Sequence, residues 1–483
     1  MTMISELQSI VGENYVTTGK DLAAYSSDWV GWYSWEPLAL VRPANTAEVA
    51  ALVKWANKNK TAIVPVSGNT GLNGGTHAEG ALMLSLDRLN KIREMRADAR
   101  VAVVEAGVIM SQLHDAADAL NLVFPMTFGA KGSAMIGGML STNAGGSNVL
   151  RYGNTRDLCL GLEVVTPQGE IMDLMGALHK DNSGINLKHL MIGAEGTLGI
   201  ITAAVMKLAP KPLAYATAML AVPDLDDALR LLNNLQQATG GGVEAFEYMT
   251  RPYVEAHMKN HGGGEPFDAP HQINILCEVG ATAPRDADVQ PDGSVPITSY
   301  LEDVLGRMVE TGQVLDAVIA QNEAQRRQMW ERREAAGEVL LSHKPLVNTD
   351  VSVALDDVSR FIRLADARMQ QIDPGAQPMI VSHLGDGNVH YAVWPTTHDE
   401  AVHKSMVEAI EDCVVEVQGS FSAEHGIGIS KLDTMSRRKD PAALAMMRTL
   451  KTALDPNNIL NPGKVIPPAP ADQFSQLKKS SSA

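Results

Sequence analysis

Residues 65–75 read PVSGNTGLNGG. The glycine-rich part of this run follows directly on Ala62–Val66, an apolar run with the composition of a buried strand. The glycines at 68, 71, 74 and 75 permit backbone conformations that other residues avoid, so successive N–H groups can turn toward one anion. Ser67, Asn69 and Thr70 add neutral side-chain donors. A glycine loop at the end of a strand therefore indicates a phosphate-binding turn.

Two more glycine clusters follow it. Seven glycines lie between Phe128 and Gly153, far above the usual fraction of about 7%. The third cluster, Gly193–Ile200, reads GAEGTLGI. One such loop could be an ordinary tight turn, but three of them before residue 210 predict a long, flat cofactor that carries phosphates. No Walker loop is present, because Gly19-Lys20 and Gly463-Lys464 lack the following Ser or Thr, and no convincing Rossmann fingerprint is found.

Composition restricts the class of protein. The 483 residues include 40 basic and 56 acidic side chains, and the formal charge of −16 argues against nucleic acid or an anionic membrane as the main partner. Cys159, Cys277 and Cys413 are widely separated, so neither a disulfide framework nor a thiolate metal site is expected. We find no signal peptide and no transmembrane segment, and we expect a cytoplasmic protein.

The order of elements predicts two kinds of domain, with a boundary near Pro210–Pro212. Before it, Asn45 and Glu48 resemble a capping box that opens a helix between two apolar strands. Beyond it, helices alternate with spaced strands, which indicates an α+β domain with an antiparallel sheet. The expected elements are strands 38–41, 62–66, 81–86, 101–106, 160–166, 200–208, 273–279 and 347–354, helices 48–58, 224–237, 299–312, 321–340, 356–371 and 400–416, and a hairpin over 379–394.

That hairpin carries the most informative side chains. Asp386-Gly387 is typical of a two-residue type I′ turn, which would place His383 directly opposite His390. Two imidazoles at that spacing could share a divalent cation, with Glu424 as a third ligand and an open fourth position. The alternative is a histidine pair packed on a hairpin, and the residues alone leave both readings open.

Taken together, these motifs resemble a known family. The three glycine clusters are similar to the FAD domain of vanillyl-alcohol oxidase (PCMH-type) flavoproteins. The two histidines, the run Glu424–Gly428 and the run Asn457–Lys464 narrow the resemblance to FAD-dependent D-2-hydroxyacid dehydrogenases, the D-lactate and D-2-hydroxyglutarate dehydrogenase group. The similarity spans roughly residues 25–466.

The resemblance implies a two-subdomain FAD-binding domain over 1–210, an α+β cap domain over 211–424, and a C-terminal segment over 425–466 that returns to complete the FAD and active site. Residues 467–483 are expected to be a disordered tail. The FAD would be bound non-covalently, because the superfamily's attachment histidine is absent from the first loop and His77 lies beyond it. The implied FAD-binding residues are Pro65, Ser67, Gly68, Asn69, Thr70, Gly71, Leu72, Pro125, Gly132, Ser133, Gly137, Gly138, Thr142, Asn143, Gly145, Gly146, Tyr152, Glu195, Gly196, Gly199, Ile200 and Asn461.

The resemblance also implies roles in catalysis. His383, His390 and Glu424 match the ligands of a divalent metal, usually zinc, with manganese or iron as alternatives. His425 matches the general base. His383 and His425 would also contact the substrate, and Arg333 matches the arginine that binds its carboxylate, with Arg332 as the alternative.

Two residues that the family uses in its substrate site are absent from this sequence. Asn348 stands where D-2-hydroxyglutarate enzymes carry a lysine, and Gly337 stands where they carry a threonine, although His343 or Lys344 could compensate. The expected reaction is oxidation of a D-2-hydroxy acid of the D-lactate or D-2-hydroxyglutarate class to the 2-oxo acid. A flavin enzyme of the same fold acting on another alcohol or hydroxy acid, such as glycolate, is the alternative. A metal-dependent hydrolase and a non-catalytic flavin or metal carrier are more remote. The electron acceptor would be an electron-transfer flavoprotein or a quinone, and the family often forms homodimers.

Overall fold

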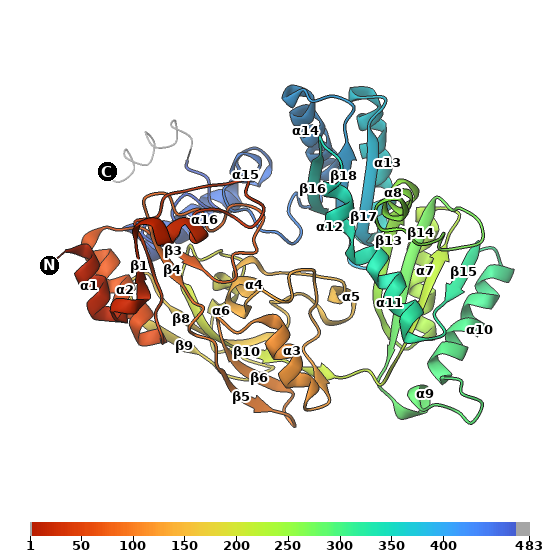
Figure 1. Ribbon diagram of the computed structural model, residues 1–483, viewed down its shortest axis with the longest axis horizontal. Helices are drawn as coiled ribbons and strands as arrows, with labels where there is room; N and C mark the ends of the chain where they lie inside the picture. The colour runs from red at the N-terminus through yellow and green to blue at the C-terminus, as the bar shows by residue number, and fades with distance from the viewer. Residues whose placement is uncertain (1, 470–483) are drawn as a thin grey trace.

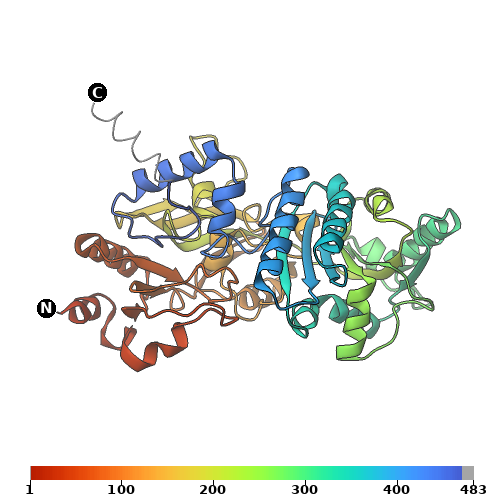
Figure 2. The ribbon, with the colours of Figure 1, turned by 90° about the horizontal axis from the view of Figure 1, so that it is seen from above.

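The computed structural model describes residues 2–469. Two lobes lie side by side, and the chain crosses between them after residue 210 (Figure 1). The end of the chain returns to the N-terminal lobe, where its helices lie beside that lobe's strands (Figure 2). Residues 470–483, most of the tail predicted to be disordered, fall outside the described range. Among the described residues, no helix combines the length and apolarity needed to cross a lipid bilayer.

The N-terminal lobe contains two main sheets. The first has the order β1-β2-β4-β3, with β2, β4 and β3 parallel, and the second is antiparallel, with the order β5-β6-β10-β8-β9. The strands are β1 (Val16–Thr17), β2 (Ala39–Val41), β3 (Ile63–Val66), β4 (Leu82–Ser85), β5 (Ile92–Arg96), β6 (Val101–Glu105), β8 (Cys159–Val165), β9 (Ile171–Leu174) and β10 (Ile200–Lys207), with a small pair of β7 (Leu122–Val123) and β11 (Ala209–Pro210).

Short helices and long loops connect these strands. The glycine clusters occupy the loop after β3, the region around α4 and the loop before β10. The first and third clusters therefore adjoin buried strands, which fix their positions. The helices of this lobe are α1 (Met3–Val11), α2 (Thr46–Asn59), α3 (Met110–Asp118), α4 (Ile136–Thr142), α5 (Val149–Tyr152) and α6 (Leu187–Met191), with the 3₁₀ turns η1 (Glu13–Tyr15) and η2 (Gly19–Tyr25).

The cap lobe is built on one seven-stranded antiparallel sheet, with the order β15-β12-β14-β13-β17-β18-β16. Its strands are β12 (Ala214–Ala221), β13 (Val243–Thr250), β14 (Ile273–Ala281), β15 (Asp316–Ile319), β16 (Val347–Ser352), β17 (Gln377–His383) and β18 (Asn388–Trp394). Its helices are α7 (Leu225–Ala238), α8 (Arg251–His261), α9 (Pro284–Ala287), α10 (Pro296–Glu310), α11 (Glu323–Glu334), α12 (Ala336–Leu341), α13 (Val358–Ile372) and α14 (Glu400–Glu416), with the 3₁₀ turn η3 (Leu355–Asp357).

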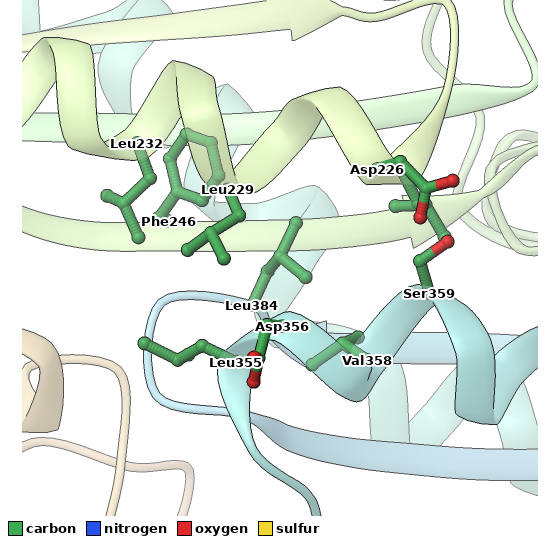
Figure 3. A pocket seen from close by; sticks show the side chains of 10 residues that line it. Asp226, Leu229, Leu232, Phe246, Leu355, Asp356, Val358, Ser359 and Leu384 are labelled. Atoms are coloured by element: carbon green, nitrogen blue, oxygen red, sulfur yellow. The ribbon is translucent and has the colours of Figure 1, made fainter.

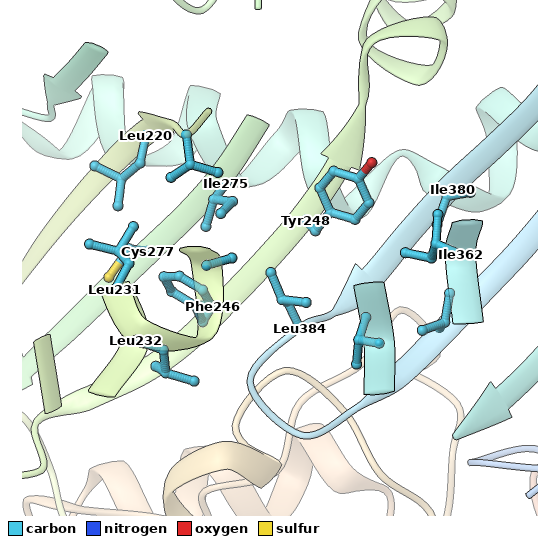
Figure 4. Close-up of a cluster of buried hydrophobic side chains, with 14 of the residues drawn as sticks. Leu220, Leu231, Leu232, Phe246, Tyr248, Ile275, Cys277, Ile362, Ile380 and Leu384 are labelled. Atoms are coloured by element: carbon cyan, nitrogen blue, oxygen red, sulfur yellow. The ribbon is translucent and has the colours of Figure 1, made fainter. Parts of the chain in front are cut away.

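The two faces of this sheet are covered differently. The back face packs on α7, α10, α13 and α14 and forms the largest apolar core, in which Phe246, Ile275 and Ile380 are buried (Figure 4). The front face packs on α8, α11 and α12 through a smaller core. Because neighbouring residues of a strand point to opposite faces, Glu247 and His383 lie on the front while Phe246 and Leu384 lie on the back. The smaller front core leaves room for polar side chains at the strand ends.

The C-terminal segment joins the two lobes. After α15 (Leu432–Arg438) and α16 (Pro441–Leu454), Leu460 forms a parallel bridge with Ile63 beside β3. Ile459 and Leu460 are fully buried, so this run has an irregular backbone but contributes to the core of the N-terminal lobe.

Most predicted elements are confirmed, with boundaries shifted by a few residues. Asn45 caps α2 by accepting a hydrogen bond from the N–H of Glu48 at 3.0 Å. The single helix predicted over 321–340 is wrong. Ala335, with ψ of 2°, leaves the helical conformation and separates α11 from α12. The three cysteines are free and buried, as expected for a chain without disulfides.

Candidate active site

Charged side chains gather on the front face of the cap sheet, where four adjacent strands end close to the N-terminal lobe. Glu247 of β13 lies opposite His383 of β17, and His390 of β18 lies opposite Asp350 of β16. The two histidines are therefore on one face, with ring centroids 5.5 Å apart. The antiparallel ladder thus brings together four residues that are distant in sequence.

The hairpin register differs from the prediction. His383 lies opposite Asn388, not opposite His390, and four residues rather than two connect the strands. Asp386 does not adopt the positive φ that a type I′ turn requires. Its carboxylate instead accepts the N–H of Asn388 at 3.0 Å, which ends the ladder early. The histidines still meet, because diagonal neighbours across a strand pair share a face.

His383, His390 and Glu424 form a group suited to a metal ion. One ligand atom of each lies within 4.8 Å of the others, and His383 Nε2 is 3.6 Å from Glu424 Oε1. Burial lowers the pKa of His390 and raises that of Glu424, which favours the neutral forms of these two groups. Two imidazoles and a carboxylate that must share one small space match the donor set of a catalytic zinc site.

Glu247 is a site residue that the sequence analysis missed. Its carboxylate is buried, lies 2.9 Å from His383 Nδ1 and accepts the Arg333 Nε–H at 2.7 Å. Burial acts to lower the pKa of His383, but the Glu247 carboxylate outweighs it and raises that pKa to about 9. A carboxylate on the second nitrogen of a ligand histidine fixes its tautomer and leaves Nε2 facing the metal group. The available signal was a pair of glutamates, Glu244 and Glu247, within a largely apolar strand.

Arg333, rather than Arg332, faces the cluster. Its Nη2 lies 3.4 Å from the ring nitrogens of His383, while Nη1 has no hydrogen-bond partner within residues 2–469. Arg332 points away and donates to the carbonyl of Gly264 at 2.8 Å. Arg333 therefore keeps Nη1 available beside the predicted metal ligands, where it could bind a carboxylate.

His425 is held by Asp350, the second residue without a role in the sequence analysis. Asp350 Oδ2 lies 3.2 Å from His425 Nδ1, and its Oδ1 accepts from Asn388 Nδ2 at 2.9 Å. Burial acts to raise the pKa of Asp350, but His425 and His390 together hold it well below its ordinary value. The carboxylate is thus ionised and orients His425, leaving Nε2 for another partner.

Glu424 and His425 reach one site because the backbone around them is irregular, as expected. Gly426 and Gly428 have φ of 72° and 53°. This loop touches the second glycine cluster directly, since a Cβ at Gly145 would lie 2.9 Å from Glu424 Oε1. The charged cluster of the cap lobe therefore adjoins the predicted FAD loops of the N-terminal lobe.

Those loops pack closely upon one another. A Cβ at Gly68 would lie 2.2 Å from the Ser133 carbonyl, one at Gly146 would lie 2.2 Å from the Thr127 carbonyl, and one at Gly196 would lie 2.5 Å from Pro65. In contrast, a Cβ added at three glycines would meet nothing within 4 Å: Gly71, Gly129 and Gly132. A cradle bordered by bare backbone that faces open space fits a flat, phosphate-bearing cofactor.

Other predicted cofactor residues have structural partners. Asn461 donates to the carbonyls of Gly75 and Glu195, while its buried Oδ1 has no partner among the described residues. That orphaned acceptor fits a cofactor N–H or O–H. The Tyr152 hydroxyl donates to Glu244 of the cap lobe at 2.8 Å, and the Ile200 side chain is in the core.

The predicted substrate position Asn348 is exposed on the front face, two residues before Asp350 and opposite Ala392. His343, the proposed compensating residue, is exposed and stacks on Trp394 with ring centroids 4.8 Å apart. Gly337 has open space around it.

A cavity of about 140 Å³ lies on the back face, between α7 and the start of α13 (Figure 3). Phe246 and Leu384 line it, and these residues adjoin Glu247 and His383 in sequence. It contains neither histidine nor arginine, so it is separate from the charged cluster.

Comparisons with known proteins agree with this architecture. The chain matches the model of the FAD linked oxidases, C-terminal domain, over residues 211–465 and that of an FAD binding domain over residues 37–175. It is 36% identical to a D-2-hydroxyglutarate dehydrogenase of Xanthomonas citri pv. viticola, covering 96% of each chain, and 34% identical to one of Stutzerimonas stutzeri, covering 96% of this chain and 98% of that protein.

Among solved structures, p-cresol methylhydroxylase with substrate bound aligns over 96% of both chains with a TM-score of 0.70 and 17% identity. At that identity the likeness shows the fold alone. The predicted fold, an α+β PCMH-type FAD-binding domain with an α+β cap and a returning C-terminal segment, is confirmed.

Proposed function

The chain belongs to the FAD-linked oxidase family, and we propose that it oxidises a D-2-hydroxy acid to the 2-oxo acid with the help of a divalent metal. The observation that carries the proposal is the contact between Glu424 and Gly145. It places His383, His390 and Glu424 against the glycine loops that fit the cofactor. We further propose residues 1–210 as the FAD domain, 211–424 as the cap and 425–466 as the returning segment.

When bound, FAD supplies the hydride acceptor and the metal supplies a positive charge that lowers the pKa of the substrate hydroxyl. His383, His390 and Glu424 would hold the metal, and zinc suits this donor set best. We propose that the FAD is non-covalent, because residues 65–75 offer no histidine and His77 packs on Trp35 with ring centroids 5.5 Å apart.

His425 is the proposed general base. Asp350 Oδ2 lies 3.2 Å from His425 Nδ1, so Asp350 would orient the ring with Nε2 toward the substrate hydroxyl. The same carboxylate stabilises the imidazolium that forms when His425 takes the proton. This division between an orienting carboxylate and a proton-accepting histidine recurs in many enzymes.

Arg333 is the proposed carboxylate clamp. Its Nε is occupied by Glu247 and its Nη2 lies 3.4 Å from the ring nitrogens of His383, so Nη1 would bind the substrate carboxylate and set the orientation of Cα. No second cation occupies the Asn348 position, so the distal carboxylate of 2-hydroxyglutarate lacks the lysine that the family provides. Monocarboxylic 2-hydroxy acids such as D-lactate should therefore serve at least as well.

A substrate panel tests the proposal. Purified flavin-loaded enzyme is mixed anaerobically with D- and L-2-hydroxy acids, and flavin bleaching is followed with and without a chelator. We expect bleaching by D acids only, suppressed by the chelator and restored by Zn²⁺. His425→Ala should keep its flavin spectrum and lose about 10²–10⁴-fold in kcat.

The control for that variant is His398→Ala, which removes an exposed histidine in the loop before α14. Near-normal turnover in His425→Ala would remove this residue from the base role. Bleaching that ignores the chelator would favour the same-fold enzyme acting without a catalytic metal.

A further inference from the structure

The run Glu424–Gly428, here called the catalytic loop, is held between two buried carboxylates from opposite lobes. Asp350 of the cap accepts from the N–H groups of Glu424 and His425 at 3.0 and 3.2 Å. Glu195 of the N-terminal lobe accepts from those of Ile427 and Gly428 at 2.6 and 3.0 Å. Four backbone donors of this short loop are therefore satisfied by two side chains that are far apart in sequence.

Glu195 belongs to the third glycine cluster, and its backbone and side chain are both held in place. It is 8% exposed and has a left-handed φ of 48°. Its own N–H donates to the Ser141 carbonyl at 2.9 Å, and its carbonyl accepts from Asn461 Nδ2 at 2.7 Å. Because backbone and carboxylate are both engaged within the protein, the position of Glu195 is fixed by the loops that form the cofactor cradle.

The catalytic loop fits against Glu195 at atomic contact. A Cβ at Gly426 would lie 2.6 Å from Glu195 Oε1, and one at Gly428 would lie 1.9 Å from the Asn73 carbonyl. Asn73 Nδ2 also donates to the carbonyls of His425 and Gly426 at 2.9 and 2.7 Å. The carbonyls and the N–H groups of this loop are thus both bound by the N-terminal lobe.

We propose that Glu195 is a positioning residue of the proposed reaction: it fixes the catalytic loop to the FAD lobe, and so sets where Glu424 and His425 lie relative to the cofactor. The proposal rests on the proposed function for the roles of those two residues. It assigns the Glu195 side chain to the protein loop, whereas the sequence analysis expected it to contact FAD.

The chemistry of the contact requires a carboxylate. Two N–H donors face the two oxygens, and a carboxylate accepts both, whereas an amide offers one oxygen and one NH₂ group. In Glu195→Gln, the NH₂ group would oppose a backbone N–H. The loop must then shift, and a displacement of about 1 Å in a catalytic group can cost about 10²-fold in rate.

The test compares flavin-loaded wild type with Glu195→Gln. We expect kcat to fall about 10²-fold while KM for the hydroxy acid stays within about twofold, because Arg333 is untouched. Zn²⁺ affinity, measured by titrating the metal-free holoenzyme, should weaken about tenfold because Glu424 is displaced. FAD content and the flavin spectrum should not change.

Glu105→Gln is the matched control. Glu105 is also 8% exposed and accepts a backbone N–H, that of Lys91, at 2.9 Å, but it lies on β6 away from the catalytic loop. It should retain wild-type kcat and Zn²⁺ affinity. Glu195→Asp keeps the charge but is one methylene shorter. It should therefore also lower kcat and Zn²⁺ affinity while KM and FAD content stay unchanged, even if the glutamine variant fails to fold.

Wild-type kcat and Zn²⁺ affinity in both Glu195 variants would overturn the proposal. So would loss of FAD with unchanged Zn²⁺ affinity, since that would make Glu195 a cofactor ligand. Failure of the wild type to oxidise any hydroxy acid would instead reject the proposed function, and the Zn²⁺ titration would still test the positioning role.

Discussion

The glycine loops of the N-terminal lobe and the front face of the cap sheet meet at one site but are built on opposite principles. The loops use backbone: Gly68, Gly146 and Gly196 let chain segments approach to distances that a side chain would forbid. The cap face uses charge: Glu247, Arg333 and His383 are buried and paired. One region recognises shape, and the other is suited to moving protons and holding a cation.

This difference determines what each region tolerates. A backbone cradle fails when atoms are added, because the segments already touch. A buried charged cluster fails when one partner is removed, because the remaining charge is left without compensation. The two regions should therefore respond to different substitutions and lose different cofactors.

The largest expected effect is from Gly68→Ala. The added Cβ would lie 2.2 Å from the Ser133 carbonyl, which is backbone and cannot move aside without shifting the second glycine cluster. We expect the purified variant to carry almost no flavin, measured by its absorbance, while its unfolding free energy falls by about 1–3 kcal/mol. Zn²⁺ binding at the cap cluster should persist.

The control for this variant is Gly306→Ala, in the middle of α10, where a Cβ meets nothing within 4 Å. It should retain flavin and be slightly stabilised, since alanine is the better helix former. A Gly68→Ala protein with a normal flavin content would mean that the loop contact is not needed for the cradle.

Glu247→Gln is expected to have the opposite effect, with flavin retained and metal binding weakened. In the metal-free protein, Glu247 raises the pKa of His383 to about 9, so a proton competes with the metal below that pH. Wild-type Zn²⁺ affinity should therefore increase with pH until about pH 9. The variant should bind Zn²⁺ about 10–100-fold more weakly at its plateau, which it should reach at lower pH.

The matched control is Glu278→Gln on β14. Glu278 is also buried on the front face and accepts from an α11 arginine, Arg326, at 2.7 Å, but it lies outside the metal cluster. Its substitution should lower stability without altering the pH dependence of Zn²⁺ binding. Equal Zn²⁺ titrations for wild type and Glu247→Gln would exclude the orienting role.

The glycine loops were readable from sequence because their chemistry is local. Residues 65–75 carry the turn and its donors in one run, and the structure places that run directly after β3. The hairpin histidines could be predicted for the same reason. The predicted register was wrong, because the Asp386 side chain captures a backbone N–H, which dipeptide turn preferences do not reveal.

Glu247 and Asp350 could not be found in the same way. Each acts on a histidine from another strand, and that pairing depends on the strand order of the whole sheet. In sequence, Glu247 is one of two glutamates in the run 243–250, a pattern that equally fits an edge or a surface strand. Local patterns thus predict candidate ligands, while the residues that would orient them emerge only from the tertiary structure.

The smallest expected effect is a gain of function from Asn348→Lys. This substitution adds a charge to the cap face and leaves the glycine loops unchanged, so it tests the cap face alone. Asn348 is exposed, two residues before Asp350 on the same face. Asn348→Lys should raise kcat/KM for D-2-hydroxyglutarate about tenfold, equal to about 1.4 kcal/mol, by pairing with the distal carboxylate. D-lactate has no such carboxylate and should show no gain. Asn348→Met, similar in length but uncharged, is the control. An equal change for both substrates in the lysine variant would show that the distal carboxylate does not reach this position.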